Sequence, residues 1–447
     1  MATGVTPADL YGNPLSTRSS DAAEHYGRAL DLQLSGNPGA MEALDAAITA
    51  DEGFAIAHVD RARLLQLGGK IPDARAAAQR ARKLAPGTSA WEQSRIETLA
   101  VTVEGTAADA LARAREHLER HPRDPLVVFA ASMLIFFGGA ADRAAERLHL
   151  SEQLAPFYGD DWWFLSMHAF SLHEVFRIDE SREKVVRSLA LRRDNFNAAH
   201  SMAHVEIESE QMADGSEFLD GWLPEHNRRA GLYSHLAWHL ALFELSQGNE
   251  QRVMELYEDE IRPGQSHWNA LGMLADSASL LWRCELFGDR EIGEDGARWE
   301  ALSEFSSEAF PPVSVAFADL HRALAYAAAG DAGSLGTLID GLKTAQREGR
   351  LPAGEVVPAL AEAIAAFAAE DYDAAISLLE PLEDDIGRVG GSHAQWQVFE
   401  DTLLEAYLRA GRTDLVEPLL RKRIDRNPTE HDRQLLNRAL AGAEQFS

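Results

Sequence analysis

The sequence predicts an all-α solenoid of about ten to eleven helix pairs. Alanine-rich amphipathic segments alternate with short Gly, Asp or Pro punctuation along the whole chain. No convincing run of alternating polar and apolar residues indicates β-strands. The second helix of a pair often ends in proline, as at Pro86, Pro122, Pro156 and Pro428. The interval from Pro122 to Pro156 matches the period of about 34 residues of a tetratricopeptide repeat.

Glycines after apolar runs mark the expected ends of long helices, because glycine adopts the left-handed conformation of a C-cap at little cost. These are Gly36, Gly68, Gly105, Gly138, Gly248, Gly288, Gly330 and Gly411. The first helices of the pairs are predicted at 20–35, 53–68, 88–104, 124–138, 160–176, 195–212, 231–247, 266–287, 312–329, 355–370 and 392–410. Residues 1–18 form an irregular lead-in, and 19–447 form one superhelical domain whose final helix, near 430–443, caps the array.

Composition excludes several classes of function. The formal net charge of −29 argues against sequence-independent binding of nucleic acid and against docking on an anionic membrane. The longest apolar stretch, near 126–137, is too short to span a bilayer. The N-terminus lacks the basic and apolar regions of a signal peptide, and the single cysteine, Cys284, cannot form an intramolecular disulfide. We therefore expect a cytoplasmic protein.

Two helical segments carry matching histidine pairs, His200/His204 and His235/His239, about one repeat apart. Residues four positions apart share a helix face, so each pair projects two imidazoles in the same direction. Both pairs fall on predicted first helices, which line the concave side of such an array. His168 lies on the preceding first helix at a similar interval, so it is expected in a neighbouring row.

This clustering supports more than one chemistry. Neutral imidazoles bind zinc and other first-row metals, so His200, His204, His235 and His239 are candidate ligands of a divalent metal such as zinc. The zincin motif is absent, because no glutamate follows the first histidine of either pair. The same histidines, with Glu208 two turns beyond His200, are alternatively catalytic acid–base groups that need no metal.

Four segments resemble the tetratricopeptide repeat protein 38 family and its bacterial relatives. They are Asn195–Glu210, Ser234-His235-Leu-Ala-Trp238-His239, Asp276–Arg283 and Gly390-Gly-Ser-His393-Ala-Gln395. The resemblance covers nearly the whole chain and implies a tetratricopeptide superhelix, but it implies little about activity. It also marks the loop with His393 and Gln395 as a hallmark. Because a superhelix of this length curves through more than one turn, the last repeats are expected to fold over the groove and bring His393 toward the histidine rows.

We therefore predict a histidine-lined concave pocket that binds a small molecule, with hydrolysis or isomerisation as its chemistry. Further residues expected to contact the ligand are His168, His173, Trp238, Asp276, Arg283, His393 and Gln395. The alternative is a non-catalytic scaffold that binds a peptide or protein, the usual role of this fold. Lysine and arginine are sparse at 195–247, which favours a small ligand over an acidic peptide. The chain could also form a homo-oligomer, because an uncapped end of the solenoid can pair with a second copy.

Overall fold

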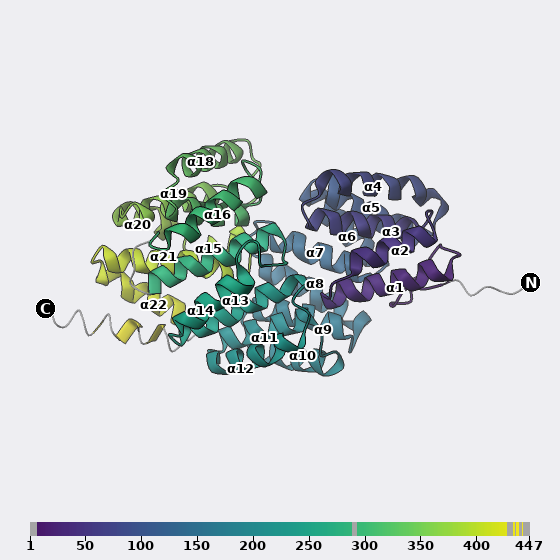
Figure 1. Cartoon of the computed structure of the whole chain (residues 1–447), viewed down its shortest axis with the longest axis horizontal. Helices are drawn as coiled ribbons and strands as arrows, with labels where there is room; N and C mark the ends of the chain where they lie inside the picture. Colours follow the sequence, from purple (N-terminus) through teal and green to yellow (C-terminus); the bar gives the residue numbers. More distant parts are fainter. Residues whose placement is uncertain (1–6, 288–292, 427–431, 434, 438–439, 441–447) are drawn as a thin grey trace, which may run out of the picture.

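The structure is a computed structural model that describes residues 7–287, 293–426, 432–433, 435–437 and 440. It is an all-α superhelix of paired helices, and the described residues contain no β-strand (Figure 1). The first helices of the pairs are α1 Ser20–Ser35, α3 Ala55–Leu67, α5 Ala90–Glu104, α7 Pro125–Phe136, α9 Trp162–His173, α11 Phe196–Glu208, α13 Gly231–Ser246, α15 Ala270–Phe287, α17 Ala316–Ala328, α19 Val356–Ala368 and α21 His393–Arg409.

The second helices are α2 Ala40–Ala50, α4 Ile71–Leu84, α6 Ala107–Arg120, α8 Arg143–Tyr158, α10 Ile178–Leu191, α12 Met212–Trp222, α14 Glu250–Leu256, α16 Gly296–Ala309, α18 Ala332–Arg347, α20 Tyr372–Leu379 and α22 Thr413–Arg426. Short 3-10 turns lie at Ala85–Gly87, Leu223–Glu225, Glu380–Leu382 and Ile386–Val389, and α14 continues into a π-helical turn at Tyr257–Ile261. The predicted fold class is confirmed. The predicted capping helix near 430–443 falls mostly outside the described residues.

First and second helices differ in how their side chains are buried. Nearly every residue of α9 is buried, from Trp163 to His173, whereas α10 buries only Ser181, Val185 and Ser188. Most consecutive first helices pack against one another, and each second helix covers one flank of its partner. Helices α9, α11 and α13 are therefore almost wholly buried, and polar residues on them need partners inside the protein.

Side-chain caps fix where the first helices begin. The Asp124, Asp161 and Asn195 side chains accept hydrogen bonds from backbone N–H groups in the first turns of α7, α9 and α11. At the other ends, Gly36, Gly248, Gly330 and Gly411 adopt positive φ as expected. Gly68 and Gly138 do not, because in these Gly-Gly pairs the second glycine takes the left-handed conformation. Gly105 adopts extended backbone instead, with φ −97° and ψ −163°. Gly288 lies outside the described residues.

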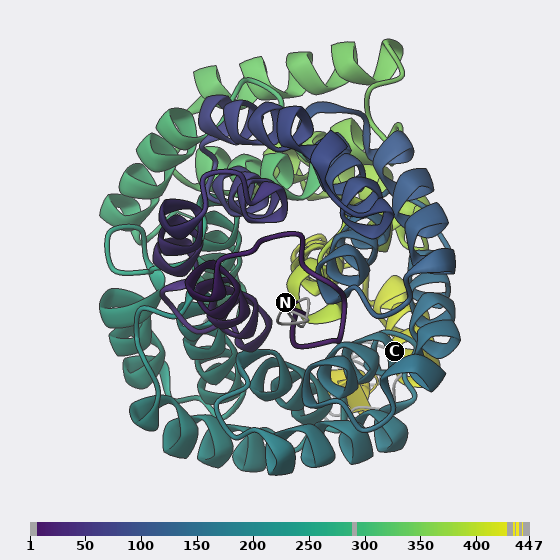
Figure 2. The ribbon, with the colours of Figure 1, turned by 90° about the vertical axis from the view of Figure 1, so that its right-hand side faces the viewer.

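Hydrogen bonds join successive turns of the superhelix, which Figure 2 shows along its long axis. The Asn197 Nδ2 group of α11 donates to the carbonyl of Leu34 at the end of α1, at 2.9 Å. One turn later, Arg143 of α8 donates to the carbonyls of Gly387 and Gly391, both at 2.8 Å. Residues near 387–391 are thus held against the middle of the chain, far from them in sequence.

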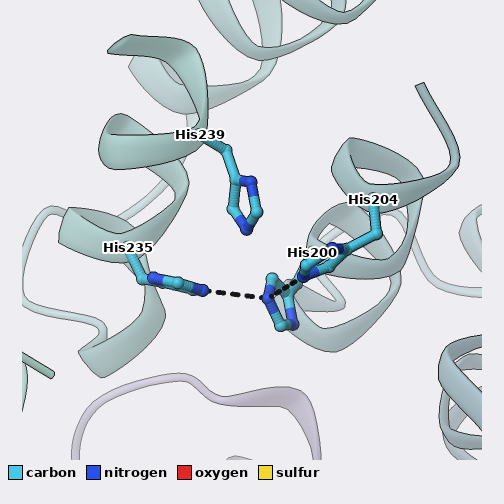
Figure 3. A group of neighbouring side chains, drawn as sticks. All are labelled: His200, His204, His235 and His239. Atoms are coloured by element: carbon cyan, nitrogen blue, oxygen red, sulfur yellow. Dashed lines mark hydrogen bonds between the residues drawn. The ribbon is translucent and has the colours of Figure 1, made fainter. Parts of the chain in front are cut away.

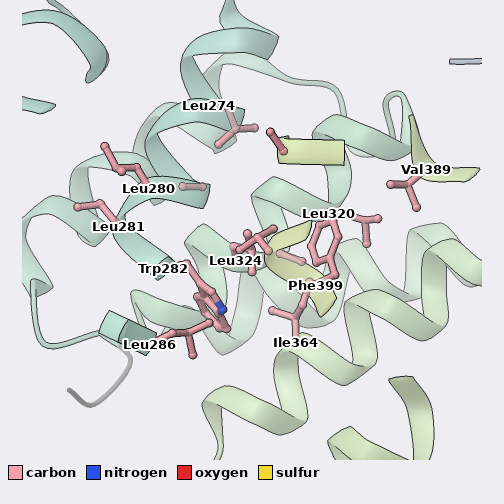
Figure 4. Close-up of a cluster of buried hydrophobic side chains, with 14 of the residues drawn as sticks. Leu274, Leu280, Leu281, Trp282, Leu286, Leu320, Leu324, Ile364, Val389 and Phe399 are labelled. Carbon is pink, nitrogen blue, oxygen red and sulfur yellow. The ribbon is translucent and has the colours of Figure 1, made fainter. Parts of the chain in front are cut away.

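Helix α21 packs against α15 as well as against its neighbours in sequence. The Trp282 indole donates to Thr402 Oγ1 at 3.0 Å, and Arg283 Nη2 donates to the carbonyl of Ala394 at 2.7 Å. Phe399 of α21 lies among leucine and isoleucine side chains of the adjoining helices, including Leu320 and Ile364 (Figure 4). The last repeat therefore closes over the inner surface of α15.

The lead-in lies along the beginnings of several first helices. Residues 7–15 fold back on themselves, with Leu15 N–H donating to the Pro7 carbonyl at 2.7 Å. The Tyr11 hydroxyl reaches Asp161 at the start of α9, at 3.3 Å. No helix in the described part of the chain is long and apolar enough to cross a membrane.

Candidate functional site

Four histidines from two adjacent first helices meet inside the superhelix (Figure 3). His200 and His204 come from α11, and His235 and His239 come from α13. One ring nitrogen from each lies within 4.8 Å of all the others. The Nε2 atom of His200 is 3.0 Å from Nε2 of His204 and 3.0 Å from Nε2 of His235. We call this group the histidine centre.

The positions at which α11 and α13 start explain why the two pairs coincide. His200 and His204 are the fourth and eighth residues after Phe196, the first residue of α11. His235 and His239 hold the same positions relative to Gly231, the first residue of α13. Because stacked first helices begin at the same edge of the solenoid, equal offsets place the four rings side by side.

Burial keeps three of these imidazoles neutral. The pKa values of His200, His204 and His239 lie well below the usual 6.5, first because burial penalises the charged form and then because neighbouring histidines repel one another when protonated. His204 and His239 are fully enclosed, whereas His200 is the one member of the centre that is only partly buried. Neutral imidazole is the form that binds a metal ion.

Asp276 of α15 orients one ring of the centre. Its Oδ2 atom is 2.9 Å from Nδ1 of His235, which leaves Nε2 of His235 directed at His200. Burial raises the pKa of the Asp276 carboxyl, and the contacts with His235 and Gln395 lower it in part. A carboxylate behind a histidine is the usual outer partner of a metal ligand.

Aromatic rings enclose His235. The Trp238 ring lies nearly parallel to it, with centroids 5.2 Å apart, and the Trp268 ring is 4.3 Å away on centroids. Gly272 makes room for Trp268, because a Cβ atom there would lie 2.1 Å from the indole. Trp268 lies two residues before the start of α15.

Residues of α9 complete the other side of the histidine centre. The His173 ring stacks on His204 with centroids 4.4 Å apart, and Phe170 stacks on His200 at 5.2 Å. Nε2 of His173 is also 3.2 Å from Glu174 Oε1. His173 is therefore a direct neighbour of the centre, and Phe170, which lies beside it, was not singled out from the sequence.

His168 is not brought to the centre, contrary to the expected row. It is the sixth residue after Trp162, the first of α9, and so is two positions out of register with His200. Two residues rotate a helix by roughly 200°, which turns the side chain away. Burial, with a smaller effect of Lys184, lowers the pKa of His168 to about 4, and its charged neighbours lie on α8, α10 and the turn between α9 and α10.

The end of the chain does reach α11. His393 Nδ1 lies 2.8 Å from Glu208 Oε1, so this loop contacts the helix that carries His200 and His204. Ser392 caps α21 with Gln395 in a capping box. Gln395 is in turn a neighbour of Asp276, so its loop touches the outer partner of His235. Arg283, by contrast, has its side chain against Ala394 and Asp401, where it holds α21 rather than the centre.

No protein-family model matches the chain. Three solved structures with tetratricopeptide or related architecture align with it at low identity. The P58(IPK) TPR domain is 15% identical over 88% of this chain and 89% of its own, with a TM-score of 0.21. Human IFIT1, solved as a dimer with m7Gppp-AAAA, is 15% identical over 89% and 90%, with a TM-score of 0.39. Naa15/Naa10 bound to HypK-THB is 13% identical over 96% of this chain and 74% of that one, with a TM-score of 0.22. The helix pairs of the chain itself carry the fold assignment.

Proposed function

We propose that the histidine centre binds a divalent metal ion of the zinc class inside the superhelix. The observation that carries the proposal is the convergence of four ring nitrogens within 4.8 Å from matching positions of two helices. In a tetrahedral zinc site with Zn–N bonds of about 2.0–2.1 Å, neighbouring nitrogens are roughly 3.3 Å apart. The two contacts of 3.0 Å at His200 need only a small adjustment to reach that spacing.

We favour metal binding over a mechanism in which the histidines act as acid–base catalysts without a metal. A general acid or base works best when its pKa lies near the working pH. The pKa values of His200, His204 and His239 are held far below neutrality by burial, so these rings are poor proton donors. Both ring nitrogens of His239 and Nδ1 of His204 also lack a hydrogen-bond partner. A bound cation would give at least one of these nitrogens a partner.

We infer further that the ion is exposed to a small-molecule ligand on the side of His200. His200 is only partly buried, whereas the other three histidines are enclosed. Four imidazoles fill a tetrahedral site, so the ion would bind a water or a ligand atom by accepting a fifth ligand or by releasing His200. In that state it would supply Lewis acidity and a water of lowered pKa, which makes hydrolysis the default chemistry. Asp276 would position His235, and Glu208, Trp238, His173, His393 and Gln395 would shape the surroundings.

Membership in the tetratricopeptide repeat protein 38 family is part of this proposal. The segments that carry the resemblance supply the four histidines, Asp276, His393 and Gln395, which lie together although they are far apart in sequence. A peptide-binding scaffold is less well supported, because α21 packs along the inner surface of α15 where a peptide groove would run. We keep the cytoplasm as the proposed location.

Elemental analysis of the purified protein tests the proposal. We expect about one equivalent of a divalent metal in the wild type and its loss in His200→Ala and His235→Ala. His168→Ala is the matched control, since it removes a buried histidine of the neighbouring helix that does not face the centre. A metal-free wild type that cannot be loaded with zinc, or metal retained in both variants, would contradict the proposal.

A further inference from the structure

A second polar group lies directly behind the histidine centre. The group consists of Arg143 and Arg147 of α8 and of Glu174 at the end of α9. The side chains of Arg143 and Glu174 are 6% and 3% exposed, and Arg147 as a whole residue is 4% exposed. The Arg147 guanidinium packs on the Phe170 ring at 4.3 Å from its centroid. Because the same Phe170 ring stacks on His200, Arg147 is one aromatic ring from the centre.

The charges of this group do not balance. Glu174 is the one carboxylate that acts electrostatically on Arg147. It also forms an ion pair with Arg143, with Glu174 Oε2 3.7 Å from Arg143 Nη1. Burial raises the pKa of Glu174, but His173 and the two arginines outweigh it and bring the value to about 2, so the carboxylate is ionised. Burial lowers the pKa of Arg147 to about 10, so it stays protonated near neutral pH. Two cations thus face one anion in the interior.

The two arginines use their donors differently. Arg143 is fully engaged with backbone carbonyls, at Gly387, Phe136 and Gly391. Arg147 donates through Nε to Ser132 Oγ at 2.6 Å, while its Nη1 group is buried without a partner. The Nδ1 atom of His173 also lacks a hydrogen-bond partner, whereas its Nε2 atom contacts Glu174 Oε1 at 3.2 Å. Buried polar atoms are rarely left unpaired, and a group of them indicates a missing ligand, ion or water.

We propose that the ligand of the histidine centre is a small carboxylate-bearing molecule whose carboxylate is held by Arg147. One excess positive charge calls for a monoanion, and a guanidinium matches a carboxylate in geometry and charge. A buried unpaired cation is costly, so the free energy gained on neutralising it would favour an anion over a neutral ligand of the same shape. This inference rests on the proposed function in one respect: the proposed metal ion fixes where the part of the ligand other than its carboxylate lies.

Equilibrium dialysis with radiolabelled acetate tests the anion site, with acetamide as the neutral molecule of the same shape. Metal-loaded and chelator-treated protein are compared, and metal content is measured in parallel. We expect about one acetate per chain and little binding of acetamide. Arg147→Met should weaken acetate binding by about 10- to 100-fold, and Arg147→Lys should lose less because it keeps the charge.

Arg177→Met is the matched control. It removes an exposed arginine, paired with Glu152 and Glu180, that lies on the neighbouring helix turn. Equal binding of acetate and acetamide, or acetate binding unchanged in Arg147→Met, would overturn the inference. If Arg147→Met does not fold, Arg147→Lys and the wild-type preference for acetate over acetamide decide it. A wild-type protein that retains its metal but does not bind acetate refutes the anion site alone. Acetate binding without any metal refutes the metal site alone.

Discussion

Two buried polar groups occupy the same kind of position in this superhelix, and they differ in how completely they are paired. In the first, Arg95 of α5 bridges Asp60 of α3 and Asp124 at the start of α7, at 2.7 and 3.2 Å. Tyr26 donates to Asp60, and His117 contacts Asp124 at 3.1 Å. We call this group the Arg95 network. Arg95 Nε is the one side-chain polar atom of these five residues left without a partner.

The histidine centre and its neighbours on α8 and α9 are the opposite case. Unpaired buried atoms occur on Arg147, His173, His204 and His239. A buried group that satisfies itself holds helices together and needs nothing else, whereas one that does not is stable only if something is added. The comparison indicates a stabilising role for the Arg95 network, and it is consistent with the proposed ligand binding at the histidine centre.

The largest expected effect is on the Arg95 network. Arg95→Met leaves two buried carboxylates without their cation, which typically costs about 3–5 kcal/mol in the free energy of unfolding. Denaturant unfolding followed by circular dichroism measures the loss. Arg61→Met is the control, because its pair with Asp45 is partly exposed and should contribute less than about 1 kcal/mol. Equal effects of the two substitutions would contradict the structural role of the network.

The next effect concerns removal of the metal. At free metal about 1,000 times its Kd, binding stabilises the folded state by about 4 kcal/mol. Chelation should therefore reduce hydrogen-exchange protection in α11 and α13 and leave α3, α5 and α7 unchanged. Hydrogen exchange read by mass spectrometry distinguishes the two regions. A uniform loss of protection along the chain would show that the metal, if bound, is not local to the histidine centre.

A smaller effect is expected for Asp276, the carboxylate that contacts His235. Asp276→Asn keeps the shape of the side chain but removes its charge, and loss of such an outer partner typically weakens metal binding by about 10- to 100-fold. Competition with a chelator of known affinity measures the change in Kd. Asp45→Asn, an exposed carboxyl far from the centre, provides the control. Unchanged metal affinity in Asp276→Asn would mean that His235 does not need orientation by a carboxylate.

The smallest effect is expected at the junction with the last repeat. His393→Ala removes the contact of 2.8 Å with Glu208 and should cost about 1–2 kcal/mol in local stability at the start of α21. Faster hydrogen exchange in the first turn of α21, with metal content unchanged, is the expected result. Metal loss in this variant would instead make the last repeat part of the metal site.

Much of the fold was predictable from local chemistry. Period, proline punctuation and glycines after apolar runs are local signals, so the first helices were placed within a few residues. The histidine pairs were predictable for the same reason, because the spacing of His200 and His204 fixes their shared helix face. His168 was misplaced because register depends on where Asp161 starts α9, and an interval counted along the chain does not contain that.

What the sequence by itself determined is the helix-pair repeat and the two matching imidazole pairs, since both follow from interactions between residues close in the chain. The tertiary structure alone decided that Asp276 stands behind His235, that Arg147 lies one ring from His200, and how the Gln395 loop meets both α11 and α15. These contacts depend on the curvature of the whole superhelix, which sums small rotations over many repeats and has no local signature.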